Sequence, residues 1–190
     1  MSDEVDLKSL IISNATFLFA QNGFNKTSIQ KIADTTKTSQ TNVLYHFKTK
    51  KVLFEACLLN AISKNRQILL KYKSKSKFDS LIHLLNTNVN WAIKSPHECQ
   101  LFLLMFYFAS NDEHFLKLST RLSADGQNLL KEYLSTFSFK SGFDLESTSS
   151  ILQSYIHGVM FNIISRKDKS IKANYKNNIE NIVLSFIEVK

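Results

Sequence analysis

The chain has 190 residues, 44% of them hydrophobic, and a formal net charge of +8. This hydrophobic content excludes general disorder, and four Gly with one Pro are too few for the turns of an all-β protein. We therefore expect an all-α protein of about nine helices, with a small domain joined to a medium one.

Several classes of protein are disfavoured. The acidic start of the chain lacks the basic and apolar regions of a signal peptide, and the longest apolar run, residues 101–109, is under half a membrane span. Cys57 and Cys99 are far apart and have no Cys-x-x-Cys partner, so neither a disulfide nor a zinc site is expected. We expect a cytoplasmic protein without membrane association, metal or cofactor.

The positive charge is unevenly distributed. Residues 1–77 hold 13 Lys/Arg against 5 Asp/Glu, whereas residues 78–190 hold 11 of each. A basic module beside a neutral one is what attraction to phosphates would require. The alternative is a lysine-rich surface that reflects only an AT-rich genome.

The first predicted helix covers residues 6–21 and ends at Asn22-Gly23, where Gly can adopt a left-handed cap. Thr27 is placed to cap the next helix, and Gln30 completes a capping box. That helix has one narrow apolar face, made by Ile29, Ile32 and Ala33.

A turn at residues 35–38 and a second cap, Ser39, precede a short helix at residues 40–46. This helix carries Gln, Thr, Asn, Tyr and His, whose donors and acceptors suit base edges and phosphates. The pattern predicts a helix-turn-helix whose second helix enters the major groove of DNA.

Residues 7–54 resemble the N-terminal domain of the tetracycline-repressor (TetR) family of bacterial transcriptional regulators. The similarity is carried by Leu18-Phe19-Ala20, Asn22-Gly23-Phe24, Thr27-Ser28-Ile29, Ile32-Ala33, residues 44–50 and Leu53-Phe54. The resemblance implies an all-helical homodimer that represses a nearby promoter and releases DNA when a small molecule binds its C-terminal domain.

Three positions depart from the usual pattern of this family. Lys37 and Thr41 stand where Gly is common, and Leu44 stands where Tyr is common. If the backbone at Lys37 is left-handed, a residue other than Gly costs about 1 kcal/mol there. Leu44 has no donor for a phosphate but suits contact with a thymine methyl group.

Two kinds of DNA contact are expected. Gln40, Thr41 and Asn42 lie on the first turn of the short helix, where a major-groove helix meets bases. Lys48, Thr49 and Lys50 surround the start of the following helix, a place that favours anions, and the resemblance singles out Lys50. The predicted DNA-binding residues are Thr27, Ser28, Ser39, Gln40, Thr41, Asn42, Leu44, Tyr45, His46, Lys48, Thr49 and Lys50. Alternatively, the polar face is merely solvated and Thr27 is only a cap.

The sequence suggests a DNA-binding domain at residues 1–50 and a regulatory domain at residues 51–190. A long helix at about 49–72 connects them, and the basic segment 71–77 is read as a solvated linker and the likeliest boundary. Five further helices are expected at residues 78–93, 96–109, 112–136, 145–165 and 173–189. The helix at 96–109 is apolar on all sides and should lie in the middle of the second domain.

The second domain is expected to bind a small neutral or lipophilic effector, because its helices supply aromatic residues with a few polar groups. The candidate pocket residues are Phe54, Leu58, His83, Asn86, Asn90, Trp91, Phe102, Phe106, Tyr107, Phe115, Tyr155 and Phe161. Aromatic residues at helical spacing are also typical of an ordinary core, and that alternative stays open.

The last two helices carry apolar stripes that predict a four-helix dimer interface. The candidate interface residues are Ile151, Leu152, Tyr155, Ile156, Gly158, Val159, Ile163, Tyr175, Ile179, Ile182, Val183 and Phe186. The alternative is that both stripes are absorbed by the core of one chain.

The leading interpretation is a repressor that binds a palindromic operator as a homodimer and is released by its effector. A constitutive DNA-binding protein or an activator is one alternative. A reuse of the scaffold as an enzyme or carrier is another, but no catalytic triad, metal-ligand spacing or phosphate-binding loop is visible. We therefore expect no enzymatic activity.

Overall fold

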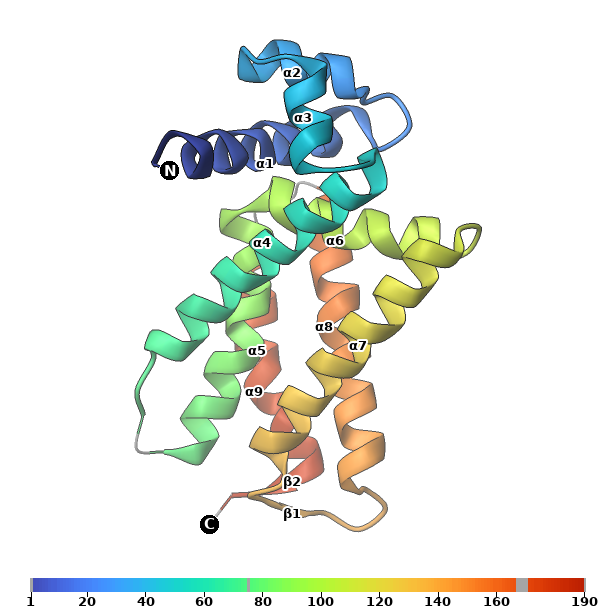
Figure 1. Cartoon of the computed structure of the whole chain (residues 1–190). Helices are drawn as coiled ribbons and strands as arrows, with labels where there is room; N and C mark the ends of the chain where they lie inside the picture. The colour runs from blue at the N-terminus through green and yellow to red at the C-terminus, as the bar shows by residue number, and fades with distance from the viewer. Residues whose placement is uncertain (1, 75, 167–170, 190) are drawn as a thin grey trace. The chain divides into compact units, whose positions relative to one another are not determined.

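The computed structural model describes residues 2–74, 76–166 and 171–189. These residues form nine helices, so the expected all-α class is confirmed (Figure 1). The helices are α1 (Ser2–Asn22), α2 (Ile29–Thr36), α3 (Gln40–His46), α4 (Lys50–Lys71), α5 (Lys77–Lys94), α6 (Pro96–Ala109), α7 (Glu113–Leu134), α8 (Leu145–Arg166) and α9 (Ile171–Phe186). None of these helices is both long enough and apolar enough to cross a membrane.

A short antiparallel pair of strands was not foreseen from the sequence. Strand β1 (Ser138–Phe139) pairs with β2 (Ile187–Glu188), and Ser138 lies opposite Glu188. The last helix therefore ends at Phe186, earlier than predicted. A pair this short depends on its neighbours, since two residues per strand cannot form a stable ribbon alone.

The chain divides into two compact units. Unit 1 comprises Met1–Lys64 and His97–Leu104, and unit 2 comprises Asn65–Pro96 and Met105–Lys190. The packing division thus falls inside α4, not at residue 50 or in the 71–77 segment. The functional division at residue 50 stays a prediction.

The core of unit 1 explains why this unit extends past residue 50. The ring of Phe54, from α4, lies edge-on to Phe19 of α1 at 5.3 Å and to Phe24 at 5.5 Å. All three side chains are buried, and Leu53 and Leu58 of α4 are completely so. Aromatic residues contribute large buried areas, and edge-on pairs add to this stabilisation. The first part of α4 is therefore needed to complete the hydrophobic core beneath α1–α3.

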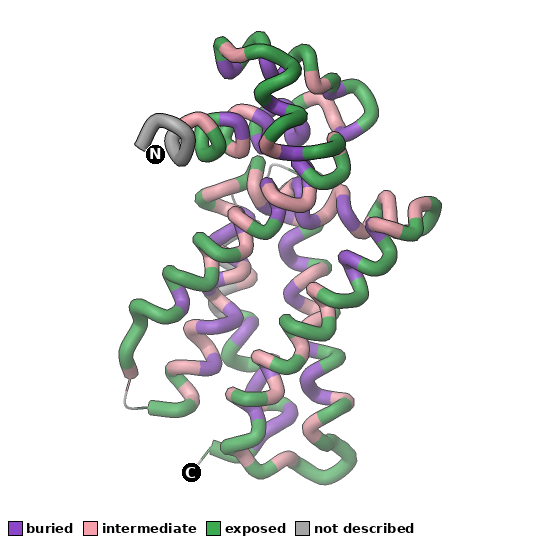
Figure 2. The backbone as a smooth tube through the Cα atoms, in the orientation of Figure 1, coloured by how far each residue is buried: buried purple, intermediate pink, exposed green. Residues whose placement is uncertain are grey.

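In unit 2, α5, α7, α8 and α9 run side by side as a bundle (Figure 1). Helix α5 packs against α7, α8 and α9, and its apolar face buries Leu81, Leu85 and Val89. Figure 2 shows how buried and exposed residues alternate along these helices, as the 3.6-residue period requires.

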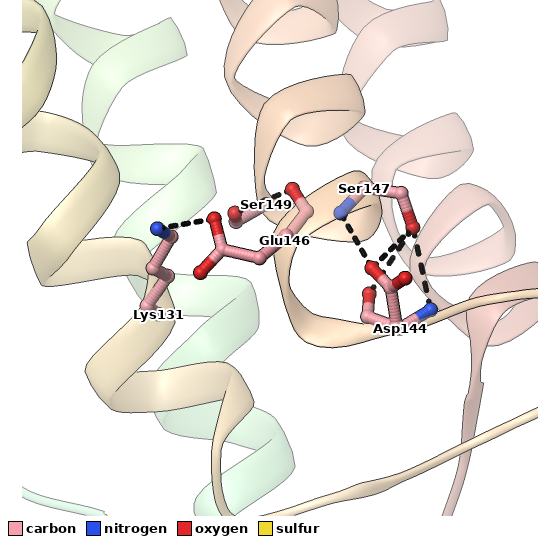
Figure 3. A network of polar contacts seen from close by, with 5 residues as sticks. All are labelled: Lys131, Asp144, Glu146, Ser147 and Ser149. Atoms are coloured by element: carbon pink, nitrogen blue, oxygen red, sulfur yellow. Dashed lines mark hydrogen bonds and ion pairs between the residues drawn. The ribbon is translucent and has the colours of Figure 1, made fainter.

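The start of α8 is fixed by a polar network (Figure 3). The Asp144 carboxylate accepts hydrogen bonds from the backbone N–H and the hydroxyl of Ser147, both at 2.7 Å. These bonds hold the pKa of Asp144 below its usual value. Glu146, in the first turn, forms an ion pair with Lys131 of α7 at 2.6 Å. The network therefore caps α8 and ties its first turn to α7.

Many predicted dimer-interface residues lie instead in the core of the single chain, so the prediction is wrong for them. They are Leu152, Ile156, Val159, Ile163, Ile179, Val183 and Phe186, all buried. Ile151 and Gly158 are exposed, and Tyr155, Tyr175 and Ile182 are half-buried. The apolar residues of α8 thus extend around more than one side of the helix, and most of them pack inside the same chain.

The expectation that α6 lies in the middle of the second domain is also wrong. Its first part, His97–Leu104, packs as part of unit 1, and Tyr107 is 72% exposed. In unit 1 the His97 ring lies edge-on to Phe17 of α1, and Glu98 forms an ion pair with Lys64 of α4 at 3.0 Å. A continuous apolar run therefore does not imply uniform burial.

Candidate DNA-binding site

Helix α2 is capped by Ser28, whose hydroxyl accepts a hydrogen bond from the backbone N–H of Lys31 at 3.0 Å. The prediction that Thr27 forms this cap is wrong. The expected capping box is also absent, because the Gln30 side chain donates to Asp34 one turn later, at 2.7 Å. Ser and Thr are comparable caps, so adjacent residues of this kind leave the sequence ambiguous by one position.

Thr27 is instead completely buried, and its hydroxyl bonds to the chain before it. The hydroxyl lies 2.8 Å from the carbonyl oxygen of Gly23 and 3.1 Å from that of Leu18. A buried hydroxyl facing the end of α1 has no access to a DNA phosphate. Thr27 therefore stabilises the loop between α1 and α2 through these two hydrogen bonds.

The turn between α2 and α3 has the left-handed backbone anticipated at Lys37, with φ 57° and ψ 43°. The N–H of Lys37 donates to the Asp34 carbonyl, and the N–H of Thr38 donates to the Ala33 carbonyl. These bonds satisfy the last carbonyls of α2 in the manner of a left-handed helix end. The chain thereby reverses quickly enough to bring α3 against α2.

Helix α3 has the predicted bounds and cap. The Ser39 hydroxyl accepts a hydrogen bond from the N–H of Asn42 at 3.1 Å. Val43 is completely buried and Phe47 is 2% exposed, so both anchor the helix on the core of unit 1. A helix of only seven residues is not stable by itself, so this anchoring determines its position.

The opposite side of α3 is open to solvent, as Figure 2 shows. We call its exposed residues the recognition face: Gln40, Thr41, Asn42, Leu44 and Tyr45. Tyr45 is 72% exposed, and its ring lies edge-on to His46, which is half-buried. The face carries no charged side chain. It offers amide, hydroxyl and methyl groups, the groups that distinguish base pairs in a major groove.

The segment after α3 brings three predicted phosphate contacts to different surroundings. Lys48 and Thr49 are exposed, and the Thr49 hydroxyl accepts a hydrogen bond from the N–H of Val52 at 3.2 Å, so it caps α4. The ammonium group of Lys50, by contrast, lies 2.9 Å from the carbonyl oxygen of Phe24. Burial lowers the pKa of Lys50 from its usual value.

One cation near the site was missed from the sequence. The Nζ atom of Lys8, on α1, lies 5.9 Å from the centre of the Phe47 ring, at the end of α3. Lys8 is exposed. It is remote in sequence from residues 40–50, and only the packing of α1 brings it there.

The predicted effector-pocket residues do not lie together, because they are divided between unit 1, unit 2 and the surface. Phe54 and Leu58 belong to the core of unit 1, and Phe102 is also in that unit. Tyr107 and Phe161 lie on the surface, at 72% and 59% exposure. For Phe54, Leu58, Tyr107 and Phe161 the pocket prediction is therefore wrong.

The remaining candidates lie in unit 2: His83, Asn86, Asn90, Trp91, Phe106, Phe115 and Tyr155. His83 stacks on Tyr72, with ring centres 3.8 Å apart, and Phe106 lies 5.5 Å from His157. Burial lowers the pKa of both histidines, which favours their neutral forms.

Comparisons with known proteins agree with this geometry. Residues 11–57 match the model of a family described as "Bacterial regulatory proteins, tetR family". The "Biofilm operon icaADBC HTH-type negative transcriptional regulator IcaR" of Staphylococcus aureus (strain Newman) is 26% identical over 117 residues, which cover 62% of this chain and 54% of that protein. The "HTH-type transcriptional regulator QacR" of Staphylococcus aureus (strain Mu50 / ATCC 700699) is 30% identical over 103 residues, covering 54% of this chain and 55% of that protein. The matched part thus spans about half the length of these curated relatives.

The fold as a whole is also shared with solved structures. A TetR transcription regulator from Haloarcula marismortui superposes with a TM-score of 0.83 at 18% identity, covering 97% of this chain and 100% of that one. At this level of identity the likeness shows the fold alone. The match to the tetR family of bacterial regulatory proteins thus covers α2, α3 and parts of α1 and α4, and the helix-turn-helix geometry of this segment agrees with it.

Proposed function

We propose that this protein is a transcriptional regulator that binds operator DNA through α3. The observation that carries this proposal is the recognition face. A short helix, capped by Ser39 and anchored by Val43 and Phe47, presents only uncharged polar and apolar side chains to solvent. A surface helix without Lys or Glu is unusual unless its exposed side chains bind a partner. The amide, hydroxyl and methyl groups of this helix suit contacts with the edges of bases.

In the proposed complex, Gln40, Thr41 and Asn42 face base edges, since they lie on the first turn of α3. Leu44 contacts a thymine methyl group, and Tyr45 with His46 reaches bases or phosphates. Asn42 is positioned for this role, because its side-chain amide already donates to Thr38 at 3.0 Å and is held at the surface.

Phosphate contacts are assigned to groups around this helix. Ser28, Ser39 and Thr49 lie at the starts of helices, where unpaired backbone N–H groups and the positive end of the helix dipole attract anions. Exposed Lys48 and Lys8 add positive charge beside α3. Such contacts position the helix without reading sequence.

We further propose that the protein acts as a homodimer on a palindromic site, because one helix-turn-helix makes too few contacts for tight specific binding. The exposed side of α8 supports this, with Ile151 at 44% and Phe161 at 59% exposure on either side of Gly158. A Cβ atom at Gly158 would meet nothing within 4 Å in the chain itself. An exposed Gly inside a helix costs about 1 kcal/mol relative to Ala, and close passage of a second helix gives it a purpose.

Dimerisation is testable at Gly158. Gly158→Gln adds bulk at a site that is open in one chain, so folding is expected to persist while the dimer weakens. Sedimentation equilibrium would measure the association constant of the dimer. The control cannot be Gly142→Gln, because Gly142 has a positive φ of 87° and a side chain there would strain the backbone. Thr120→Gln, at an exposed position of α7, serves instead as the control. An unchanged dimer in both variants would place the interface elsewhere.

We further propose that a small neutral or lipophilic effector binds in unit 2 and regulates DNA binding. Its support is polar groups inside the bundle. The side-chain oxygen of Asn86 is buried and lacks a hydrogen-bond partner among the described residues, as does the buried hydroxyl of Thr148. Unsatisfied buried groups of this kind cost about 1–3 kcal/mol each unless a ligand or water occupies them.

The sign of regulation is proposed to be repression. IcaR of Staphylococcus aureus, one of the relatives, is a negative transcriptional regulator by name, and this supports the same sign here. If the effector releases DNA, the two sites are linked reciprocally, so operator DNA must weaken effector binding by the same factor. Equal effector affinities with and without operator would refute the switch.

The DNA-binding proposal is tested by selecting duplexes from a random-sequence library with the purified protein, then measuring affinity against salt. Lys48→Ala is expected to weaken binding to every duplex and to reduce the salt slope by about 0.9. Gln40→Ala is expected to relax preference at one or two base pairs, by about 1–3 kcal/mol each, with the slope kept. Lys117→Ala, in unit 2 and ion-paired with Glu113, is the charge control. If the unmodified protein binds no duplex even in dilute buffer, the proposed function is refuted.

A further inference from the structure

The side chain of Lys50 makes its contacts inside unit 1, away from the recognition face. Its ammonium group lies 2.9 Å from the carbonyl oxygen of Phe24 and 3.5 Å from that of Asn25. The same Nζ atom lies 4.5 Å from the centre of the Phe24 ring. Lys50 is the first residue of α4, so one side chain joins the start of α4 to the loop between α1 and α2.

Electrostatics favours this arrangement over an outward-pointing lysine. A cation at the first turn of a helix is disfavoured by the positive end of that helix's own dipole. The carbonyls of Phe24 and Asn25 follow the C-terminal end of α1, which carries the negative end of a dipole. The ammonium group is therefore more stable beside the carbonyls of Phe24 and Asn25 than it would be beside the N-terminus of α4. The aromatic face of Phe24 adds a cation–π attraction.

The loop that Lys50 contacts is held by other residues as well. Its first residue, Gly23, has a positive φ of 75°, and the Thr27 hydroxyl bonds back to Gly23 and Leu18. Ser28, the cap of α2, follows directly. The position of this loop consequently sets where α2 begins, and α2 packs directly against α3.

We propose that Lys50 is a positioning residue that ties the start of α4 to the loop between α1 and α2 and thereby fixes the recognition face, and that it is not a phosphate contact. This inference rests on the proposed DNA-binding function and departs from what the family resemblance implies for this lysine. The contact of Lys50 also connects α4 to α2 and α3, since any displacement of the first turn of α4 strains the loop between α1 and α2.

The first test uses the unmodified protein without DNA. Side-chain ¹⁵N NMR at low temperature is expected to show a Lys50 ammonium signal that exchanges with water at least about tenfold more slowly than that of exposed Lys48, since a bonded ammonium group must open before it exchanges. Equal exchange rates for the two lysines would overturn the proposal.

The second test compares three variants. Lys50→Met keeps the apolar stem and removes the ammonium group, Lys50→Arg restores donors, and Lys48→Met removes a neighbouring exposed cation. In Lys50→Met, amide exchange at residues 23–27 of the free protein is expected to rise about tenfold, as loss of a charge-assisted hydrogen bond implies. Lys50→Arg is expected to return this protection, and Lys48→Met to leave it unchanged.

DNA binding then separates positioning from direct contact. For a duplex selected from a random library, Lys50→Met is expected to lower affinity about tenfold with an unchanged salt slope, whereas Lys48→Met lowers the slope by about 0.9. A lower slope in Lys50→Met with normal loop protection would make Lys50 a phosphate contact and overturn the proposal. The exchange measurements need no DNA, so a protein that binds no duplex refutes the proposed function and leaves the loop contact separately tested.

Discussion

A substitution at Thr27 tests whether its hydroxyl stabilises the loop between α1 and α2. The perturbation is Thr27→Val, which keeps the branched shape and removes the hydroxyl. In the structure this hydroxyl donates at 2.8 Å to the carbonyl of Gly23 and at 3.1 Å to that of Leu18, in a site with no solvent exposure. A phosphate-contacting threonine would instead lose DNA affinity and leave folding unaffected.

The expected magnitude follows from the carbonyl groups. Leu18 also accepts a hydrogen bond from the Asn22 side chain at 3.0 Å, so it keeps a partner. The Gly23 carbonyl loses its bond to Thr27, and the loss of this partly buried hydrogen bond costs about 1–1.5 kcal/mol of unfolding free energy. Thr27→Ser keeps the hydroxyl and removes one buried methyl group, which costs about 1 kcal/mol.

The assay is urea unfolding followed by far-UV circular dichroism. Tryptophan fluorescence is unsuitable, because the single tryptophan, Trp91, is in unit 2. Salt-dependent DNA binding, measured well below the unfolding transition, is expected to keep the slope of the unmodified protein in both variants. Surface substitutions usually change the free energy of unfolding by no more than about 0.5 kcal/mol. If both variants stay within that range of the unmodified protein, the stabilising role of the Thr27 hydroxyl is refuted.

Three further predictions concern stability and reactivity. Lys37→Gly is expected to raise the unfolding free energy by about 0.5–1 kcal/mol, because φ is 57° there and Gly adopts this conformation without strain. The pKa of Asp144 is lowered by its bonds to Ser147, so its contribution to stability is present above its ordinary pKa and is lost as pH falls through the lowered value. Melting temperatures between pH 2 and 6 should therefore converge with those of Asp144→Asn at low pH. Burial raises the thiol pKa of Cys57 and Cys99 to about 12, so neither should react with a thiol reagent at pH 8 until urea unfolds the protein.

Each of these has a contrary result. A destabilised Lys37→Gly would mean that the lost charge near the end of α2 outweighs the relieved strain. A constant difference between Asp144→Asn and the unmodified protein across the acid range would show that this carboxylate does not contribute through ionisation. Rapid labelling of native Cys57 or Cys99 would show that unit 1 opens readily.

Local sequence features determined the helix-turn-helix. The bounds of α3 and its Ser39 cap were predicted, because caps and the 3.6-residue period act within one or two helical turns. The left-handed backbone at Lys37 was considered only through the family resemblance, in which Gly is common at this position.

Predictions that depended on distant partners failed more often. Thr27 and Ser28 are interchangeable caps in a local pattern, and only the position of the Leu18 and Gly23 carbonyls makes Thr27 the buried one. Likewise, Phe54 was assigned to a ligand pocket, although its contacts with Phe19 and Phe24 place it in the core of unit 1.

The sequence by itself determined the helical class, the short capped helix α3 and the concentration of positive charge, since each depends on neighbouring residues or on composition. Only the tertiary structure decided which apolar stripes become core, and where the Lys50 ammonium group bonds. The physical reason is that burial and charge pairing depend on which surfaces meet. Two residues 26 positions apart, such as Lys50 and Phe24, acquire a shared role only when the packing of α1 against α4 brings them within hydrogen-bond distance.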